Sequence, residues 1–140
     1  KNKKKNYFSF VLIGDGECNE GSIWEAAMLG SKYKLNNLVA IIDKNGFQQT
    51  GSTKGIMDMG NMEEKWKSFG WDTISIDGHN ISSLIDCLNK KKLLKKKLPT
   101  AIIANTIKGK GISFIENNND WHHNLLTKSQ YDQAILELGF

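Results

Sequence analysis

The sequence predicts an α/β fold, an open parallel sheet with helices on both of its faces. Short apolar segments of strand length alternate along the chain with segments that have helical periodicity. The apolar segments are continuous runs, whereas a half-exposed strand would alternate polar and apolar residues. Continuous runs are typical of parallel strands that crossover helices bury on both faces. The strands are expected at residues 7–13, 38–42, 71–76 and 100–106.

Helical spacing of apolar residues fills the intervals between these strands. Asn80 and Ser129 are candidate N-caps, because their side chains can accept a hydrogen bond from a free backbone N–H of the first turn. In the last helix, Tyr131, Ile135 and Leu138 are expected to face inward. Residues 47–60, which are rich in glycine, and residues 108–119 are expected to be loops. The helices are expected at residues 22–34, 62–69, 82–92 and 127–138.

Composition excludes several classes of protein. The chain has 140 residues, of which 39% are hydrophobic, so it can bury a core. All 19 basic residues are lysine, and arginine is the residue suited to bidentate contacts with bases and phosphates. The net charge of +4 is therefore interpreted as solvated surface, with no nucleic-acid partner. No apolar run approaches the roughly 18 residues of a membrane span, and no secretory signal is visible, so we expect a cytoplasmic protein.

Polar residues gather where the predicted strands end, which is where open α/β sheets bind ligands. The turn Gly14-Asp15-Gly16 follows the first strand, and Asn45-Gly46 follows the second. Each is an ordinary turn sequence when taken alone. However, Asp15 and Asn45 are 30 residues apart, the length of one βαβ unit, and a right-handed crossover brings them to one sheet edge. Their oxygens suit Mg²⁺, and the glycines let backbone amides approach a diphosphate.

The sequence segments that contain these features resemble those of the transketolase family. Residues 14–51, GDGECNEGSIWEAAMLGSKYKLNNLVAIIDKNGFQQTG, resemble its thiamine diphosphate motif, which opens with GDG and closes with an asparagine. Residues 69–80 (FGWDTISIDGHN), 99–123 (PTAIIANTIKGKGISFIENNNDWHH) and 131–139 (YDQAILELG) are similar to the rest of that domain in split, small-subunit transketolases. The resemblance implies that residues 1–140 are the C-terminal part of a thiamine diphosphate-binding domain, with no second domain.

The resemblance also implies a set of metal and cofactor contacts. Asp15 and Asn45 would bind Mg²⁺ through their side-chain oxygens, and Phe47 would contribute its backbone carbonyl. Gly14 and Gly16 would flank the diphosphate of thiamine diphosphate.

Two further residues are implied to take part in catalysis. His122 matches the histidine that reaches the diphosphate and the reacting sugar, and Glu20 matches a glutamate of a proton network near the subunit interface. The sequence departs from many relatives at His123, where they have glycine, and at Gln49-Thr50, where they have an apolar residue and aspartate.

The function implied is that of a transketolase, which transfers a two-carbon ketol unit from a ketose phosphate to an aldose phosphate, with pentose phosphates as the default substrates. The pyrimidine-binding domain would come from a C-terminal transketolase subunit, in a homo- or hetero-oligomer, and the chain would be a fragment or one subunit. Three alternatives stay open: another thiamine diphosphate enzyme of a specialised sugar pathway or of the deoxyxylulose-phosphate synthase type, a catalytically silent subunit, and a basic nucleic-acid-binding α/β domain.

Overall fold

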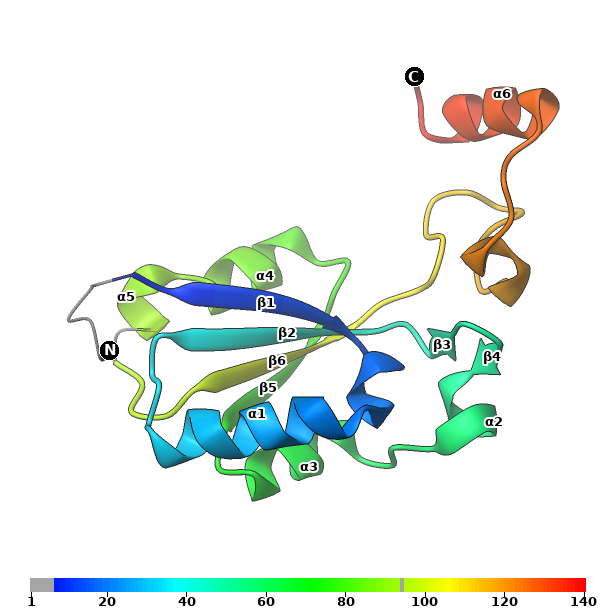
Figure 1. The fold of residues 1–140 in the computed structure, drawn as a ribbon. Helices are drawn as coiled ribbons and strands as arrows, with labels where there is room; N and C mark the ends of the chain where they lie inside the picture. Colours follow the sequence, from blue (N-terminus) through cyan, green and yellow to red (C-terminus); the bar gives the residue numbers. More distant parts are fainter. Residues whose placement is uncertain (1–6, 94) are drawn as a thin grey trace.

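Four parallel strands form the main sheet of the computed structural model, which describes residues 7–93 and 95–140. Every neighbouring pair in this sheet is parallel, which confirms the predicted fold class. The carboxyl ends of the strands therefore lie together at one end of the sheet (Figure 1). In spatial order the strands are β1 (Ser9–Gly14), β2 (Leu38–Lys44), β6 (Thr100–Asn105) and β5 (Asp72–Asp77).

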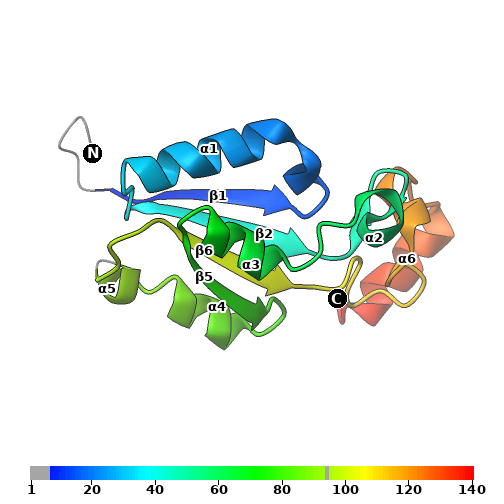
Figure 2. The ribbon, with the colours of Figure 1, turned by 90° about the horizontal axis from the view of Figure 1, so that it is seen from below.

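Helices cover both faces of the sheet (Figure 2). The helices α1 (Gly21–Lys32) and α3 (Met62–Ser68) lie on one face, and α4 (Ile81–Cys87) and α5 (Lys90–Leu93) lie on the other. None of the helices in the described parts of the chain is long and apolar enough to cross a membrane.

The core consists of two apolar clusters, one on each face of the sheet. Successive strand residues point to opposite faces, so Ala40 and Ile42 of β2 join the cluster under α1 and α3, while Val39 joins the other. Trp66 is 1% exposed, and its ring lies 4.8 Å from that of Trp71, measured between ring centroids. Both tryptophans therefore belong to the core on this face of the sheet.

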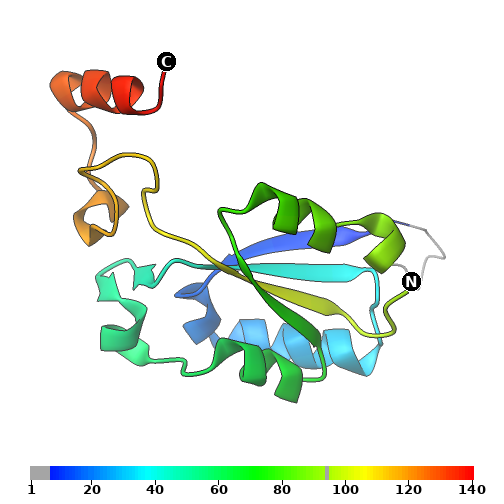
Figure 3. The ribbon, with the colours of Figure 1, turned by 180° about the vertical axis from the view of Figure 1, so that it is seen from behind.

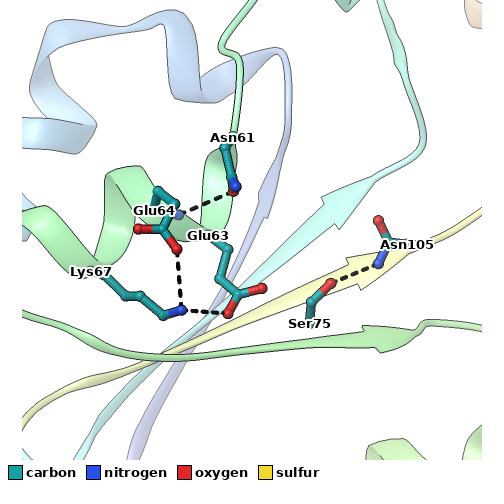
Figure 4. Close-up of polar contacts among 6 residues, drawn as sticks. All are labelled: Asn61, Glu63, Glu64, Lys67, Ser75 and Asn105. Carbon is teal, nitrogen blue, oxygen red and sulfur yellow. Dashed lines mark hydrogen bonds and ion pairs between the residues drawn. The ribbon is translucent and has the colours of Figure 1, made fainter.

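Side-chain hydrogen bonds fix the ends of several elements (Figure 4). Asn61 caps α3, because its Oδ1 accepts a hydrogen bond from Glu64 N at 3.1 Å. Glu64 also pairs with Lys67 one turn later, at 3.4 Å. At the end of β6, Asn105 donates to Ser75 Oγ of β5 at 2.9 Å, which ties the two strands together near their carboxyl ends.

Two expected elements are divided more finely than the sequence predicted. The segment expected to be a loop at residues 47–60 contains an antiparallel hairpin, β3 (Phe47–Gln48) and β4 (Gly51–Ser52), followed by the short helix α2 (Thr53–Met57). The helix expected at residues 82–92 is split into α4, capped by Asn80 as predicted, and α5.

The predictions for the last helix, α6 (Lys128–Glu137), are partly wrong. Its N-cap is Thr127, not Ser129, and Thr127 forms a capping box with Gln130. Tyr131 and Leu138 do not face a core, because they are 50% and 46% exposed. The reason is that α6 projects beyond the carboxyl end of the sheet, at the end of the segment that follows β6 (Figure 3). Periodicity indicated an apolar face but not what the face packs against.

Gly16 lies where the turn after β1 meets the β3–β4 hairpin, and the space there excludes a side chain. A Cβ added at Gly16 would lie 2.6 Å from the Cβ of Gln48 and 2.9 Å from its Oε1. At Gly21, in contrast, an added Cβ would meet no atom within 4 Å.

Gly16→Ala and Gly21→Ala should therefore have opposite effects. We expect Gly16→Ala to lower the free energy of unfolding by about 1–3 kcal/mol through overpacking. Gly21→Ala should raise it by about 0.5–1 kcal/mol, because alanine restricts the unfolded chain and favours the helix. Urea unfolding of the two variants beside the wild type measures both values. A Gly16→Ala variant as stable as the wild type would show that the hairpin leaves room for a Cβ at Gly16.

Candidate functional site

The register of β1 and β2 brings the two predicted metal ligands to the same sheet edge. Gly14 pairs with Asp43, and the next backbone N–H, that of Asp15, donates to Asp43 O at 3.1 Å. The side chain of Asp15 then reaches across to the turn after β2, where its Oδ2 accepts a hydrogen bond from Gly46 N at 2.8 Å. Asp15 and Asn45 are therefore neighbours in space, as the βαβ spacing predicted.

The carboxylate of Asp15 is buried, and only one of its two oxygens has hydrogen-bond partners. Asp15 is 3% exposed, and its Oδ2 accepts from Gly46 and, at 3.5 Å, from Thr53 Oγ1. Its Oδ1 is buried with no hydrogen-bond partner among the residues that the structure describes. Burial raises the pKa of Asp15, the backbone N–H groups of Gly46 and Gly16 offset part of this rise, and the nearby charge of Asp43 adds to it. A buried carboxylate with an unused oxygen fits a bound cation, which would restore the charged form.

Asn45 holds the turn that carries the other predicted metal ligand. Its Oδ1 accepts from Phe47 N at 2.9 Å, and its Nδ2 donates to Asp43 Oδ2 at 3.1 Å. A carbonyl oxygen has two lone pairs, so Asn45 Oδ1 can bind a cation as well as this N–H. Within residues 7–93 and 95–140, no three His, Cys, Asp or Glu side chains form a metal cluster. A metal here would therefore depend on amide and backbone oxygens beside Asp15.

A cavity of about 530 Å³ opens at the carboxyl end of β1 and β2. Asp15 does not line it and instead borders a second cavity of about 390 Å³, together with Thr53 and Lys44. The chain neighbours of Asp15, Gly14 and Gly16, line the first cavity, whereas Asp15 itself lines the second. The predicted site residues that line the first cavity are Gly14, Gly16, Glu20, Asn45, Phe47 and His122.

Two residues of the first cavity were not singled out from the sequence. Glu17, just after the GDG turn, accepts a hydrogen bond from Gly14 N through its Oε2 at 2.5 Å. Gln48, on β3, packs against Gly16 and accepts from Asn19 Nδ2 at 3.1 Å. Their positions depend on the η1 turn (Glu17–Asn19) and on the hairpin, and neither element has a periodic signal in the sequence.

His122 reaches the first cavity from the far end of the chain. It ends the short 3₁₀ helix η2 (Asn119–His122), whereas His123 is not among the residues that line the cavity. His122 is exposed, but the slight desolvation of its ring lowers its pKa, and the positive charges of Lys108 and His123 lower it further. His122 is therefore biased toward the neutral imidazole, which can accept a proton or a hydrogen bond. Lys108, of the KGKG segment, lies close enough to contribute a positive charge there.

Three further polar or titratable residues, Glu20, Cys18 and His79, differ in their exposure and in their contacts. Glu20 occupies the N-cap position of α1, is exposed, and lines the cavity. Cys18 is fully buried, and burial together with the nearby charges of Asp15 and Glu17 raises the pKa of its thiol to about 12, so the protonated thiol is favoured. His79 has a structural contact, because its Nε2 accepts a hydrogen bond from Ile107 N at 2.8 Å.

Sequence relatives of the chain are transketolases and their subunits. An apulose-4-phosphate transketolase subunit from Phocaeicola vulgatus is 44% identical over 99% of this chain and 49% of its own length. A 6-deoxy-6-sulfo-D-fructose transketolase subunit from Clostridium sp. is 42% identical over 92% of this chain and 46% of its own. Human transketolase is 40% identical over 96% of this chain and 21% of its own. The chain thus spans about half the length of the two subunits.

Solved structures agree with these relatives. Transketolase from Campylobacter jejuni matches 96% of this chain and 21% of its own length, with a TM-score of 0.87 and 28% identity. The family described as "Transketolase, thiamine diphosphate binding domain" matches residues 2–140. These matches confirm the resemblance to transketolases and do not favour a nucleic-acid-binding domain. The chain therefore belongs to the family of transketolase thiamine diphosphate-binding domains.

Proposed function

We propose that this chain supplies the diphosphate- and metal-binding side of a transketolase active site. The enzyme would transfer a two-carbon ketol unit from a ketose phosphate to an aldose phosphate with thiamine diphosphate and Mg²⁺. The observation that carries the proposal is the buried, unpartnered Oδ1 of Asp15, which lies in the turn between Gly14 and Gly16, the two glycines that line the first cavity with His122. A structural carboxylate in such a position would ordinarily have both oxygens satisfied.

Mg²⁺ would be held by Asp15 Oδ1, Asn45 Oδ1 and the carbonyl of Phe47. These are hard oxygen ligands, and Mg²⁺ commonly takes its remaining ligands from phosphate and water. The raised pKa of Asp15 supports a cation at this place, because the ionised carboxylate is costly to bury without one.

The diphosphate would lie against the turn at Gly14 and Gly16. Gly14 N already donates to an anionic oxygen, that of Glu17, which supports the ability of this turn to bind anions. His122 and Lys108 would approach the same ligand from the other side. Thiamine diphosphate, when bound, supplies the electron sink for the reaction. His122 would hold or move a proton at the substrate oxygen, and Glu20 would exchange protons with a neighbouring subunit.

The partner we propose is a C-terminal transketolase subunit with the pyrimidine-binding domain. The support is that two of the relatives are named as subunits and that the chain spans about half their length. Those relatives are named for apulose-4-phosphate and 6-deoxy-6-sulfo-D-fructose, so a specialised sugar is as consistent with this chain as a pentose phosphate.

Ketol transfer by the reconstituted enzyme tests the proposed function. The chain by itself should bind thiamine diphosphate weakly or not at all and should show no turnover, since the cofactor's pyrimidine would lack its partner. The complete subunit together with a pyrimidine-domain subunit should bind cofactor and Mg²⁺ and transfer ketol units between sugar phosphates. Calorimetry and a coupled ketol-transfer assay measure the two properties. Tight binding by the 140-residue chain alone would overturn the partner requirement, and no binding after reconstitution would overturn the function.

Asp15→Asn should separate metal binding from stability. Because burial raises the folded-state pKa of Asp15, its contribution to stability is present below its unfolded pKa and is lost as pH rises through the folded value. The variant should therefore melt at the same or a higher temperature at pH 7 without ligands. It should bind Mg²⁺ with thiamine diphosphate more than about 100-fold more weakly, since even residues outside the ligand shell change metal affinity by about 10–100-fold.

The matched control for this variant is Asp58→Asn. Asp58 borders the second cavity with Asp15 but is exposed, so its replacement should leave both the melting temperature and the affinity unchanged. Thermal melts without ligands measure the stability, and calorimetry with Mg²⁺ and cofactor on the reconstituted enzyme measures the affinity. Wild-type affinity in Asp15→Asn would contradict the metal assignment.

His122→Ala should lower kcat of the reconstituted enzyme by about 10²–10⁴-fold, the usual range for a lost proton-transfer group. His123→Ala is the control, because His123 is also exposed but does not line the cavity. Steady-state kinetics of the two variants give the comparison. A larger loss in His123→Ala would transfer the role to that residue.

A further inference from the structure

Asn119 and His122 stand at the two ends of η2 and share one of its faces. A 3₁₀ helix has three residues per turn, so side chains three positions apart lie one above the other. η2 spans Asn119–His122, which gives these residues that spacing. His122 lines the first cavity, so Asn119 faces the same side of the loop. Whatever holds Asn119 therefore also fixes the orientation of His122.

The β3–β4 hairpin holds the amide of Asn119 at both of its ends. With the amide oriented so that both ends are satisfied, its Nδ2 donates to Gln48 O at 2.9 Å and its Oδ1 accepts from Gly51 N at 3.0 Å. In the opposite orientation it makes only a contact of 3.5 Å with Gln49 O, so the first orientation is preferred on hydrogen-bonding grounds. Both partners are backbone groups, and Asn119 is half-buried.

The hairpin is in turn fixed to the turn that carries Asp15. Gln48 packs against Gly16, and its Oε1 accepts from Asn19 just beyond the GDG turn. Gln48, Gln49 and Thr50 also form a wall of the first cavity. A continuous chain of contacts therefore runs from the GDG turn through the hairpin to Asn119.

We propose that Asn119 is a positioning residue, which seats His122 at the cofactor cavity by bonding the hairpin backbone. The proposal rests on the proposed function, in which His122 acts on the cofactor and substrate. It assigns the hairpin the task of aligning the last segment of the chain with the metal-binding turn. Without the two hydrogen bonds, η2 would keep its local contacts, including the hydrogen bond from Trp121 Nε1 to Phe114 O at 3.0 Å. It would no longer be held in a fixed position relative to the hairpin, and His122 would no longer be held at the cavity.

The first test follows the folded chain and needs no activity. In Asn119→Ala, the Gly51 amide should exchange with solvent several-fold faster, roughly tenfold, because it loses the side-chain acceptor and keeps only its pairing with Gln48 across the hairpin. The His122 ring should titrate at a higher pH by NMR, because desolvation at its present position lowers its pKa and the positive charges of Lys108 and His123 lower it further. The carboxylates of Glu17 and Glu20 line the same cavity and act in the opposite direction. His79 serves as an internal reference for an intact fold.

Asn124→Ala is the matched control, since Asn124 is exposed in the same loop. It should change neither the Gly51 exchange rate nor the His122 titration. Asn119→Ser removes the same two contacts with a smaller change in polarity, and it decides the question if the alanine variant fails to fold. Unchanged Gly51 exchange and unchanged His122 titration in the Asn119 variants would overturn the proposal, whether or not the enzyme is active.

The second test is a double-mutant cycle in the reconstituted enzyme. Asn119→Ala should lower kcat roughly tenfold with little change in KM, the loss expected when about two hydrogen bonds no longer align a catalytic group. On a His122→Ala background the same substitution should cost nothing further, because both act through one imidazole. Additive losses would overturn the proposal. A wild-type enzyme without ketol transfer would instead overturn the proposed function, and the NMR result would still decide the positioning role.

Discussion

The parallel pairing of β1 with β2 is the constraint on which the site depends. It sets Gly14 beside Asp43 and so places the Asp15 carboxylate against Gly46 in the neighbouring turn. A slip of one residue would turn Asp15 to the opposite face of the sheet. The register is held by side chains buried on both faces, such as Val39 and Ile42 of β2, which are fully buried. The hydrophobic core thus determines where the polar site forms.

The charges around the site explain why a cation and an anionic ligand would bind there together. Asp15 and Asp43 meet at the strand ends, and Glu17 and Glu20 line the cavity, so carboxylates outnumber nearby cations. Free diphosphate would be repelled by this arrangement, whereas a divalent cation between Asp15 and the diphosphate would reverse the local field. The buried, unpartnered oxygen of Asp15 is unfavourable in the chain alone, and a bound cation would relieve it.

The irregular segments contribute as much to the site as the sheet does. The hairpin touches the GDG turn on one side through Gln48 and the loop of His122 on the other through Asn119. Most of these contacts involve backbone groups or the absence of a side chain at Gly16. They are short and directional, so a change of one atom at this junction can move His122 without disturbing the buried core.

The sequence by itself determined the parallel α/β class, the meeting of Asp15 with Asn45, and the family. Continuous apolar runs indicate strands that are buried on both faces, and the spacing of a βαβ unit indicates which turns become neighbours. Both features can be recognised within a short stretch of sequence. Only the tertiary structure decided the hairpin within residues 47–52, the entry of Glu17 into the cavity, the projection of α6 beyond the sheet (Figure 1), and the bond of Asn119 to Gln48 and Gly51. Each of these depends on single polar contacts, or on what an exposed face meets. A contact made by one side chain leaves no periodic pattern in the sequence, whether its partner is three residues away, as for Glu17, or about seventy, as for Asn119.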